Sequence, residues 1–413
     1  MSVQKSEIRN SVEKAVLEAP IVDMHTHLYP PSFNGLLLWG IDELLTYHYL
    51  IAEVMRTHAV SYEDFWKLNK QEQAELIWRK LFLERAPISE ACRGVLTCLQ
   101  ALGIDPSERD LGKIRKYFNE QNVDDYLEKV FQIANVRYAV MTNDPFDRAE
   151  RECWEANKPL HPRLRTALRM DPLLSQWEVL SSLLREQGYE MGATLNEASL
   201  KEIRTFLDEW VERMQPKYMA VSLTPDFRYP DDSYRSEILD LCILPFAREH
   251  KLPFALMIGV KRQVNPLLKL AGDSVGKAEI SSVENLCSAH PENRFLVTFL
   301  SRENQHELAV TARKFPNLLP FGCWWFLNNP VLIEEMTRMR MELLGWSFVP
   351  QHSDARVLDQ LLYKWNHSRR IIAKVLADKY EDLLATGWSV TEEEIRRDVK
   401  RYFEQNFEEF VEY

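Results

Sequence analysis

Short apolar runs alternate along the chain with longer stretches in which apolar residues recur at spacings of three and four. The longer spacing predicts helices, as at Ile203, Phe206, Leu207 and Trp210. The short runs are rich in β-branched and aromatic residues and end in polar residues, which predicts buried strands. Eight such runs occur, at residues 21–28, 136–143, 164–171, 218–224, 253–260, 294–301, 318–326 and 346–352.

This alternation predicts an α/β protein with a parallel sheet, because parallel strands need crossover connections. Eight repeats are what a (β/α)₈ TIM barrel requires. A doubly wound open sheet is the structural alternative, but such sheets often carry a glycine-rich phosphate loop after the first strand. The chain has only 13 glycines and no such loop. We therefore expect a single barrel domain over residues 1–413.

Two segments are additional to the eight strand–helix units of a minimal barrel. Residues of about 30–135 separate the first two predicted strands, and helical patterns at 41–55, 62–83 and 90–102 predict a helical insertion that covers the barrel mouth. After about residue 353 the chain is again helical and charged. Phe403, Phe407 and Phe410 share one face of this C-terminal tail. A helix packed on the barrel is the first interpretation of that face, and an oligomer contact is the second.

Composition and charge exclude several classes of protein. With 46% hydrophobic and 27% charged residues, the chain can bury a large core as a globular protein. Its net charge of −11 argues against nucleic acid or an anionic membrane as the main partner. No run of eighteen apolar residues and no signal-peptide core occurs. The six cysteines lack Cys-x-x-Cys spacing, so we expect reduced thiols in a cytoplasmic enzyme.

His25 and His27 end the first apolar run and are the strongest candidates for chemistry. Side chains two apart on a strand point the same way, and neutral imidazole nitrogens suit zinc and similar ions. Asp354 follows the eighth run, and the first and eighth strands of a closed barrel are neighbours. Asp354 can therefore reach a metal held by the two histidines. Its alternative role is to orient Arg356 by an ordinary salt bridge.

Arginines follow three of the predicted strands, at Arg169, Arg302 and Arg356. Catalytic groups of barrels lie at the carboxyl ends of strands, so the three side chains are expected at one mouth. Converging guanidinium groups would bind a carboxylate or a polyhydroxylated ligand. Each arginine by itself is more typical of a surface ion pair.

Six short strings follow one another along most of the chain. They are DMHTHL at 23–28, LLTYHY at 44–49, LRMDP at 168–172, SREN at 301–304, GCWW at 322–325 and HSDAR at 352–356. Together these strings resemble the amidohydrolase superfamily and, within it, the uronate isomerases. The chain is shorter than typical members and looks like a compact branch.

The resemblance also separates two kinds of enzyme within the superfamily. Its hydrolases commonly add a lysine or glutamate at strand four and histidines at strands five and six. The corresponding run ends here, at 221–224, 257–260 and 300–302, contain none of these ligands. This favours a one-metal isomerase. A mononuclear hydrolase or deaminase of the same barrel remains as an alternative, as does a non-catalytic protein that binds sugar acids.

The resemblance implies an intramolecular oxidoreductase, an aldose–ketose isomerase acting in carbohydrate metabolism. Its substrates would be hexuronates, with glucuronate converted to fructuronate and/or galacturonate to tagaturonate through an enediol. One divalent ion, with zinc expected, would be held by His25, His27 and Asp354. Asp354 would start proton abstraction at C2, and Tyr49 would move the second proton between O2 and O1. Arg356 and His48 would hold the enediolate.

The remaining implied roles concern substrate binding. Arg169 and Arg302 would complete the binding of the carboxylate and hydroxyls, and Trp324 or Trp325 would wall the pocket. For Tyr49 the residues alone favour an aromatic side chain packed in the insertion. We expect a homo-oligomer that binds neither nucleic acid nor membrane.

Overall fold

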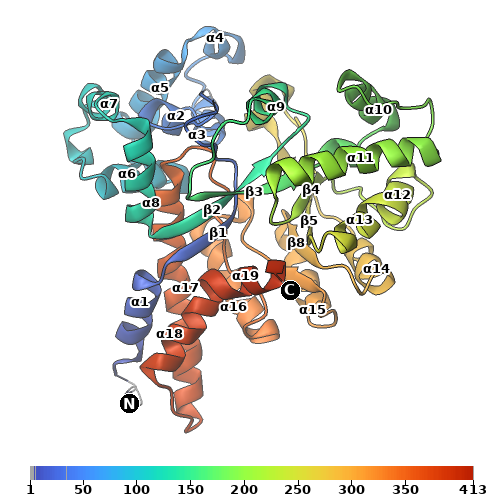
Figure 1. Ribbon diagram of the computed structural model, residues 1–413. Coiled ribbons are helices and arrows are strands. Elements are labelled where there is room, and N and C mark those ends of the chain that lie inside the picture. The colour runs from blue at the N-terminus through green and yellow to red at the C-terminus, as the bar shows by residue number, and fades with distance from the viewer. Residues whose placement is uncertain (1–3, 5, 34, 413) are drawn as a thin grey trace.

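Seven parallel strands form one curled sheet in the computed structural model, which describes residues 4, 6–33 and 35–412 (Figure 1). The order in the sheet is β1-β2-β3-β4-β5-β8-β9, so each strand pairs with the next predicted one. Seven of the eight expected strands are confirmed, most of them shorter than predicted. They are β1 (Ile21–Thr26), β2 (Val136–Asn143), β3 (Leu164–Arg169), β4 (Met219–Leu223), β5 (Phe254–Ile258), β8 (Phe295–Phe299) and β9 (Leu318–Pro320).

The eighth predicted strand is not a regular strand, and here the sequence prediction is wrong in detail. Val349 forms a single parallel bridge with Phe321. Pro350 has no backbone N–H to continue the ladder, and Asp354 adopts a positive φ of 51°. The segment nevertheless closes the sheet, since Val349 N–H donates to the Pro320 carbonyl and Asp354 N–H donates to the His25 carbonyl. The expected TIM barrel is therefore confirmed, with an irregular eighth segment.

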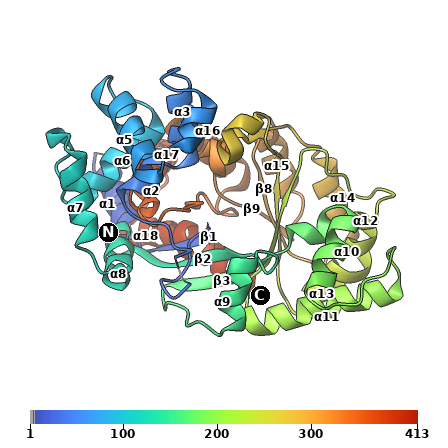
Figure 2. The same cartoon turned by 90° about the horizontal axis from the view of Figure 1, so that it is seen from above.

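The helical insertion between β1 and β2 is also confirmed and lies to one side of the barrel in both views (Figures 1 and 2). Local capping explains several helix starts. For example, Asn69 and Glu72 form a reciprocal capping box. The insertion contains α2 (Ile41–Leu45), α3 (His48–Met55), α4 (Tyr62–Lys67), α5 (Lys70–Trp78), π-helical η1 (Arg79–Leu83), α6 (Glu90–Ala101), 3₁₀ turn η2 (Pro106–Glu108), α7 (Leu111–Asn119) and α8 (Val123–Ala134).

The other helices cover the outside of the sheet. The predicted apolar stripe on α11, including Ile203, Phe206 and Trp210, is buried. No helix among residues 4, 6–33 and 35–412 combines the length and apolar character needed to cross a bilayer. The helices are α1 (Ile8–Glu18), α9 (Arg148–Glu155), α10 (Trp177–Glu186), α11 (Glu197–Met214), α12 (Tyr234–Ile238), α13 (Leu244–Glu249), α14 (Ser281–Ala289), α15 (Gln305–Ala312), α16 (Pro330–Leu344) and α17 (Gln360–Ala385).

Short elements join the strands and helices, and one hairpin stands at the barrel mouth. The hairpin pairs β6 (Val260–Lys261) with β7 (Ser274–Val275) after strand β5. The remaining short helical segments are η3 (Asp171–Leu174), η4 (Leu239–Ile243), η5 (Pro266–Gly272), η6 (Arg302–Asn304) and η7 (Trp325–Leu327).

The C-terminal tail packs against the amino end of the barrel. It comprises α18 (Glu392–Lys400), π-helical η8 (Arg401–Gln405) and α19 (Asn406–Glu412). Phe407 is buried in the interior cluster that fills the barrel, with its ring edge-on to Tyr218. Asn406 Nδ2 donates to the Phe348 carbonyl at 2.8 Å. The aromatic face of the tail is therefore a packing face, which confirms the first interpretation from the sequence.

Replacing Phe407 should destabilise the whole barrel. Phe407→Ala removes a buried ring that closes the interior cluster, and such changes cost about 3–5 kcal/mol. The urea midpoint of unfolding measures the loss. Trp388→Ala is a matched control because that aromatic side chain is 66% exposed, and it should move the midpoint little. Equal midpoints for the two variants would show that the tail is not part of the core.

Candidate metal centre and active-site pocket

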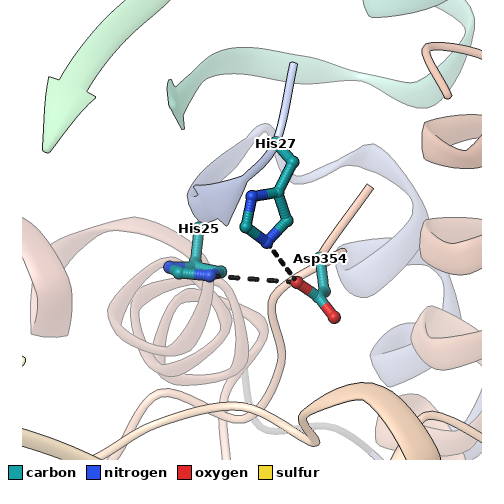
Figure 3. Close-up of side chains that lie close together, drawn as sticks. All are labelled: His25, His27 and Asp354. Carbon is teal, nitrogen blue, oxygen red and sulfur yellow. Dashed lines mark ion pairs between the residues drawn. The ribbon is translucent and has the colours of Figure 1, made fainter. Parts of the chain in front are cut away.

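His25, His27 and Asp354 lie together at the carboxyl end of β1. One ligand atom from each residue lies within 4.8 Å of the other two. His27 Nε2 is 3.4 Å and His25 Nε2 is 3.8 Å from the same oxygen, Asp354 Oδ1 (Figure 3). The three side chains predicted as metal ligands are thus brought to one point. They form the one cluster of three or more His, Cys, Asp or Glu ligands found in the described part of the chain.

The other nitrogen of His25 is held by a hydroxyl group. Tyr218 donates its single hydroxyl hydrogen to the Met24 carbonyl at 2.7 Å. The same oxygen lies 3.1 Å from His25 Nδ1, so it accepts a hydrogen bond from an Nδ1–H group. His25 Nε2 is then left with its lone pair facing Asp354. This is the neutral form of imidazole that binds a metal ion.

Thr142 holds His27 by the same arrangement. Its hydroxyl donates to the Thr26 carbonyl at 2.9 Å and lies 2.8 Å from His27 Nδ1. His27 therefore also presents a lone pair on Nε2. Asp354 Oδ1, the oxygen opposite both nitrogens, is buried and accepts no hydrogen bond from any described residue. Lone pairs that face one another at this distance fit a cation between them.

Burial sets the charges of this cluster. Burial lowers the pKa of both His25 and His27, and the neighbouring His352 lowers that of His25 further. Burial opposes the ionisation of Asp354, yet the contact with His27 and the Lys364 ammonium bring its pKa below the usual value. At neutral pH the site is therefore two neutral imidazoles and one carboxylate, a donor set that zinc accepts.

A small pocket of about 80 Å³ opens beside the cluster. It is lined from the insertion, from strand ends and from the β6–β7 hairpin. The lining residues are His25, His27, Tyr47, His48, Arg169, Ser222, Met257, Arg262, Leu270, Asp273, Trp324, Trp325, Asp354 and Arg356.

Two of the three predicted arginines reach this pocket. Arg356 has no side-chain hydrogen bond or ion pair with any described residue, so the alternative Asp354–Arg356 salt bridge does not form. Arg169 lies in the pocket and pairs with Asp171 at 2.5 Å. Asp171 also accepts the Ser222 N–H at 2.8 Å, which fixes the Arg169–Asp171 pair against strand β4.

The third arginine of the pocket is Arg262, where the sequence had indicated Arg302. The Arg302 side chain is 57% exposed and pairs with Glu335 at 3.0 Å, outside the pocket. Arg262 lines the pocket and pairs at 2.7 Å with Asp273, whose side chain is 3% exposed. Arg262 does follow the fifth apolar run. No local pattern, however, could pair it with an acid eleven residues further on.

The predicted site residues of the insertion are His48 and Tyr49, and of the two only His48 lines the pocket. His48 lines it with an Nε2 that is buried and without a partner among the described residues. Burial, with help from Arg356, lowers the pKa of His48 to about 3, so its ring is neutral. The Tyr49 hydroxyl is buried without a hydrogen bond to any described residue. Tyr47, whose ring lies 5.0 Å from that of Tyr49, is the tyrosine that lines the pocket.

Both candidate tryptophans line the pocket, so the choice between Trp324 and Trp325 does not arise. The Trp325 ring lies 5.4 Å from that of His48 and joins the β9 side of the mouth to the insertion. Sequence reasoning missed Tyr218 and Thr142, which anchor the metal ligands. Both belong to predicted strand runs, where nothing in the local pattern distinguishes an anchoring hydroxyl from an ordinary core residue.

The whole chain is similar to a solved structure of a uronate isomerase from Bacillus halodurans C-125. The two are 56% identical with a TM-score of 0.98, over 100% of this chain and 98% of that one. A uronate isomerase from Thermotoga maritima has 16% identity and a TM-score of 0.78 over 100% of both chains. A glucuronate isomerase from Caulobacter crescentus has 15% identity and a TM-score of 0.76, over 99% and 94%.

No protein-family model and no curated protein sequence matches the chain. The two distant structures show the shared fold alone. The first similarity is of another kind, because more than half of the residues are identical over practically the full length of both chains. It confirms the resemblance seen in the sequence motifs: the chain belongs to the uronate isomerase family of aldose–ketose isomerases.

Proposed function

We propose that this enzyme interconverts hexuronates and their keto forms with one divalent ion, zinc, at His25, His27 and Asp354. The reactions are glucuronate to fructuronate and/or galacturonate to tagaturonate. One observation carries the proposal. Two imidazole nitrogens with lone pairs face a buried carboxylate oxygen, and the adjoining pocket holds the guanidinium of Arg356; neither the oxygen nor the guanidinium has a partner among the described residues.

The charge of the pocket supports a sugar acid as substrate. Arg169, Arg262 and Arg356 all line it, and the first two are matched by Asp171 and Asp273. Arg356 keeps its charge and its planar set of donors free for a carboxylate or enediolate oxygen. A neutral sugar would leave that guanidinium unmatched.

Residues of this chain account for the proton transfers. When bound, a divalent ion would polarise substrate oxygens and lower the pKa of a coordinated hydroxyl. Asp354 is ionised at neutral pH because its pKa is low, so its carboxylate is available to take the proton from C2. Neutral His48 offers Nε2 to a substrate hydroxyl, and Arg356 holds the developing enediolate. Trp324 and Trp325 limit access of water.

Tyr49 is the proposed carrier of the proton between O2 and O1. Its hydroxyl is buried and makes no hydrogen bond with a described residue, so its hydrogen is not committed elsewhere. Burial raises its pKa well above the usual value, which keeps the hydroxyl protonated and able to donate. Arg302, which the sequence predicts as a substrate-binding residue, pairs with Glu335 outside the pocket, so it would contact the substrate only if its side chain left that carboxylate.

The hydrolase alternative has little support from the pocket. Strands β4 and β5 contribute Ser222 and Met257 at the positions where a binuclear hydrolase would need metal ligands. The described residues supply ligands for a single ion. A homo-oligomeric state and a cytoplasmic location stay predictions from the sequence.

Metal binding should depend on the ligands and on the hydroxyl that orients one of them. His25→Ala and His27→Ala should each abolish stoichiometric zinc, whereas Tyr218→Phe should keep both ligands yet weaken binding by about 10- to 100-fold. Competition with a chromophoric chelator measures the affinity. Tyr138→Phe is the matched control, because Tyr138 lies in the same interior cluster but bonds to Glu408 instead.

Two results would contradict this scheme. Stoichiometric zinc in both alanine variants would show that His25 and His27 are not the metal ligands. Equal zinc affinities of Tyr218→Phe and Tyr138→Phe would show that the Tyr218 hydroxyl does not set the tautomer of His25.

Arg262 and Arg302 should differ in their effect on substrate binding. Arg262→Gln removes a charged donor from the pocket, and such hydrogen bonds contribute about 1.5–3 kcal/mol. KM for glucuronate or galacturonate should therefore rise roughly tenfold to a hundredfold. Arg302→Gln breaks an exposed ion pair and should change KM little. Steady-state kinetics measure KM for each variant. A larger rise in KM for Arg302→Gln than for Arg262→Gln would show that Arg302, and not Arg262, binds the substrate.

The two tyrosines of the insertion can be separated in the same way. Tyr49→Phe should lower kcat by roughly 10²- to 10⁴-fold with KM little changed, because it removes one acid–base group and preserves the ring. Tyr47→Phe is its matched partner, since Tyr47 lines the pocket beside it. Deuterium from solvent should also appear at C1 of the ketose. A wild-type rate for Tyr49→Phe, with full transfer of a C2 label, would exclude this route.

A further inference from the structure

A second, larger groove lies at the opposite end of the barrel from the proposed active site. Its volume is about 1100 Å³, against about 80 Å³ for the catalytic pocket. The groove runs between the segments that precede β8 and β9, the turn after α13 and the C-terminal helix α19. Its lining shares no residue with the catalytic pocket, so the isomerase reaction gives it no role.

The groove carries a concentration of positive charge. Six basic side chains line it, and only two acidic ones do. Glu292 pairs with Arg248 at 3.7 Å, and Glu409 pairs with Arg401 at 3.1 Å. The other four have no carboxylate partner among the described residues. These four are Lys251, Arg294, Arg313 and Lys314.

The positive charge of the groove is opposite in sign to the net charge of the whole chain. The net charge of the protein is −11, so the excess of cations in the groove reverses the average. A concave surface lined by one sign of charge concentrates ions of the opposite sign. The groove therefore favours an anionic ligand.

Arg294 makes the groove more than a set of surface lysines. Its guanidinium is half-buried, and it donates to the Phe410 carbonyl at 2.5 Å and to the Lys251 carbonyl. Burial lowers the pKa of Arg294, and no carboxylate of a described residue pairs with its guanidinium. Two backbone carbonyls engage only part of its five N–H donors. A half-buried cation without a counter-ion is costly, and a bound anion would relieve that cost.

Apolar side chains also line the groove. Leu252, Phe315, Leu344 and Phe410 are all partly exposed to it. Pockets for organic ligands combine such surfaces with a few polar groups, and their volumes are typically several hundred to about 1000 Å³. Inorganic phosphate alone would leave the apolar part uncovered. The lining therefore indicates a ligand with both features.

We propose that this groove is a binding site for an organic anion that carries at least two negative charges next to an apolar or aromatic part. The cations without carboxylate partners bind the charged end, with Arg294 at its centre. Phe315, Leu344 and Phe410 cover the apolar end.

Three probes separate the two features of the ligand. Adenosine 5′-monophosphate carries both, inorganic phosphate carries only the charge, and adenosine carries only the aromatic part. Isothermal titration at low ionic strength should show one molecule of the monophosphate per chain, bound at least tenfold more tightly than either of the other probes. Added salt should weaken this binding.

Charge reversal in the groove tests the location. Lys251→Glu combined with Lys314→Glu should weaken binding of the monophosphate by at least tenfold and leave isomerase turnover unchanged, since neither residue lies near the catalytic pocket. Lys201→Glu on α11 is the matched control, because this lysine is exposed and makes no ion pair with a described residue. It should change neither property.

Several outcomes would overturn the proposal. They are the absence of binding at millimolar probe, equal binding by the double variant and the control, and competition between the monophosphate and the uronate substrate. Sedimentation velocity adds another. If the double variant dissociates an oligomer of the wild-type protein, the groove is an interface with a second copy and not a ligand site.

Discussion

The structure depends above all on the main-chain hydrogen bonds that close the barrel beside the metal ligands. Asp354 N–H donates to the His25 carbonyl at 3.1 Å, and His27 N–H donates to the Ala355 carbonyl at 2.8 Å. The distance between the carboxylate and the imidazoles is therefore set by the closing backbone and not by flexible side chains. Asp354 has a left-handed φ of 51°, a conformation that costs a non-glycine residue about 1–3 kcal/mol. The closing bonds maintain it and so aim the carboxylate inward.

A buried carboxylate at the start of the same motif supports this closure. Asp23 accepts the Ser353 N–H at 3.0 Å and the Trp365 indole N–H at 2.9 Å, so β1, the eighth segment and α17 are bound together. Lys364 donates to the Ser353 carbonyl at 2.6 Å from the other side. The local string that supplies the histidines thus also supplies the group that positions the third ligand. The same contacts therefore close the barrel and position the metal ligands in this chain.

Much of the fold and the metal site could be predicted from the sequence because local periodicity determines them. His25 and His27 share a face by strand geometry, and Asp354 follows from the adjacency of the first and last strands. The irregular form of the eighth segment was not predicted, because Pro350 interrupts the ladder within an otherwise strand-like run and the positive φ of Asp354, just after that run, has no local sequence signal. Arg302 shows a second limit. The end of a strand determines where the backbone of the next residue lies, but it does not determine where the side chain points. The turn η6 directs the Arg302 side chain towards Glu335 on α16.

The opposite wall of the pocket shows why long-range contacts complete the site. The hairpin that carries Arg262 is joined to the insertion, since Trp66 Nε1 donates to the Leu267 carbonyl at 2.8 Å and Asn265 Nδ2 donates to the Tyr62 hydroxyl at 3.2 Å. The partners are 201 and 203 residues apart, so no local window of sequence contains both. The insertion therefore does more than add His48 and the tyrosines to the mouth. It holds the hairpin in place, and through Asp273 the hairpin holds Arg262 towards the metal ligands.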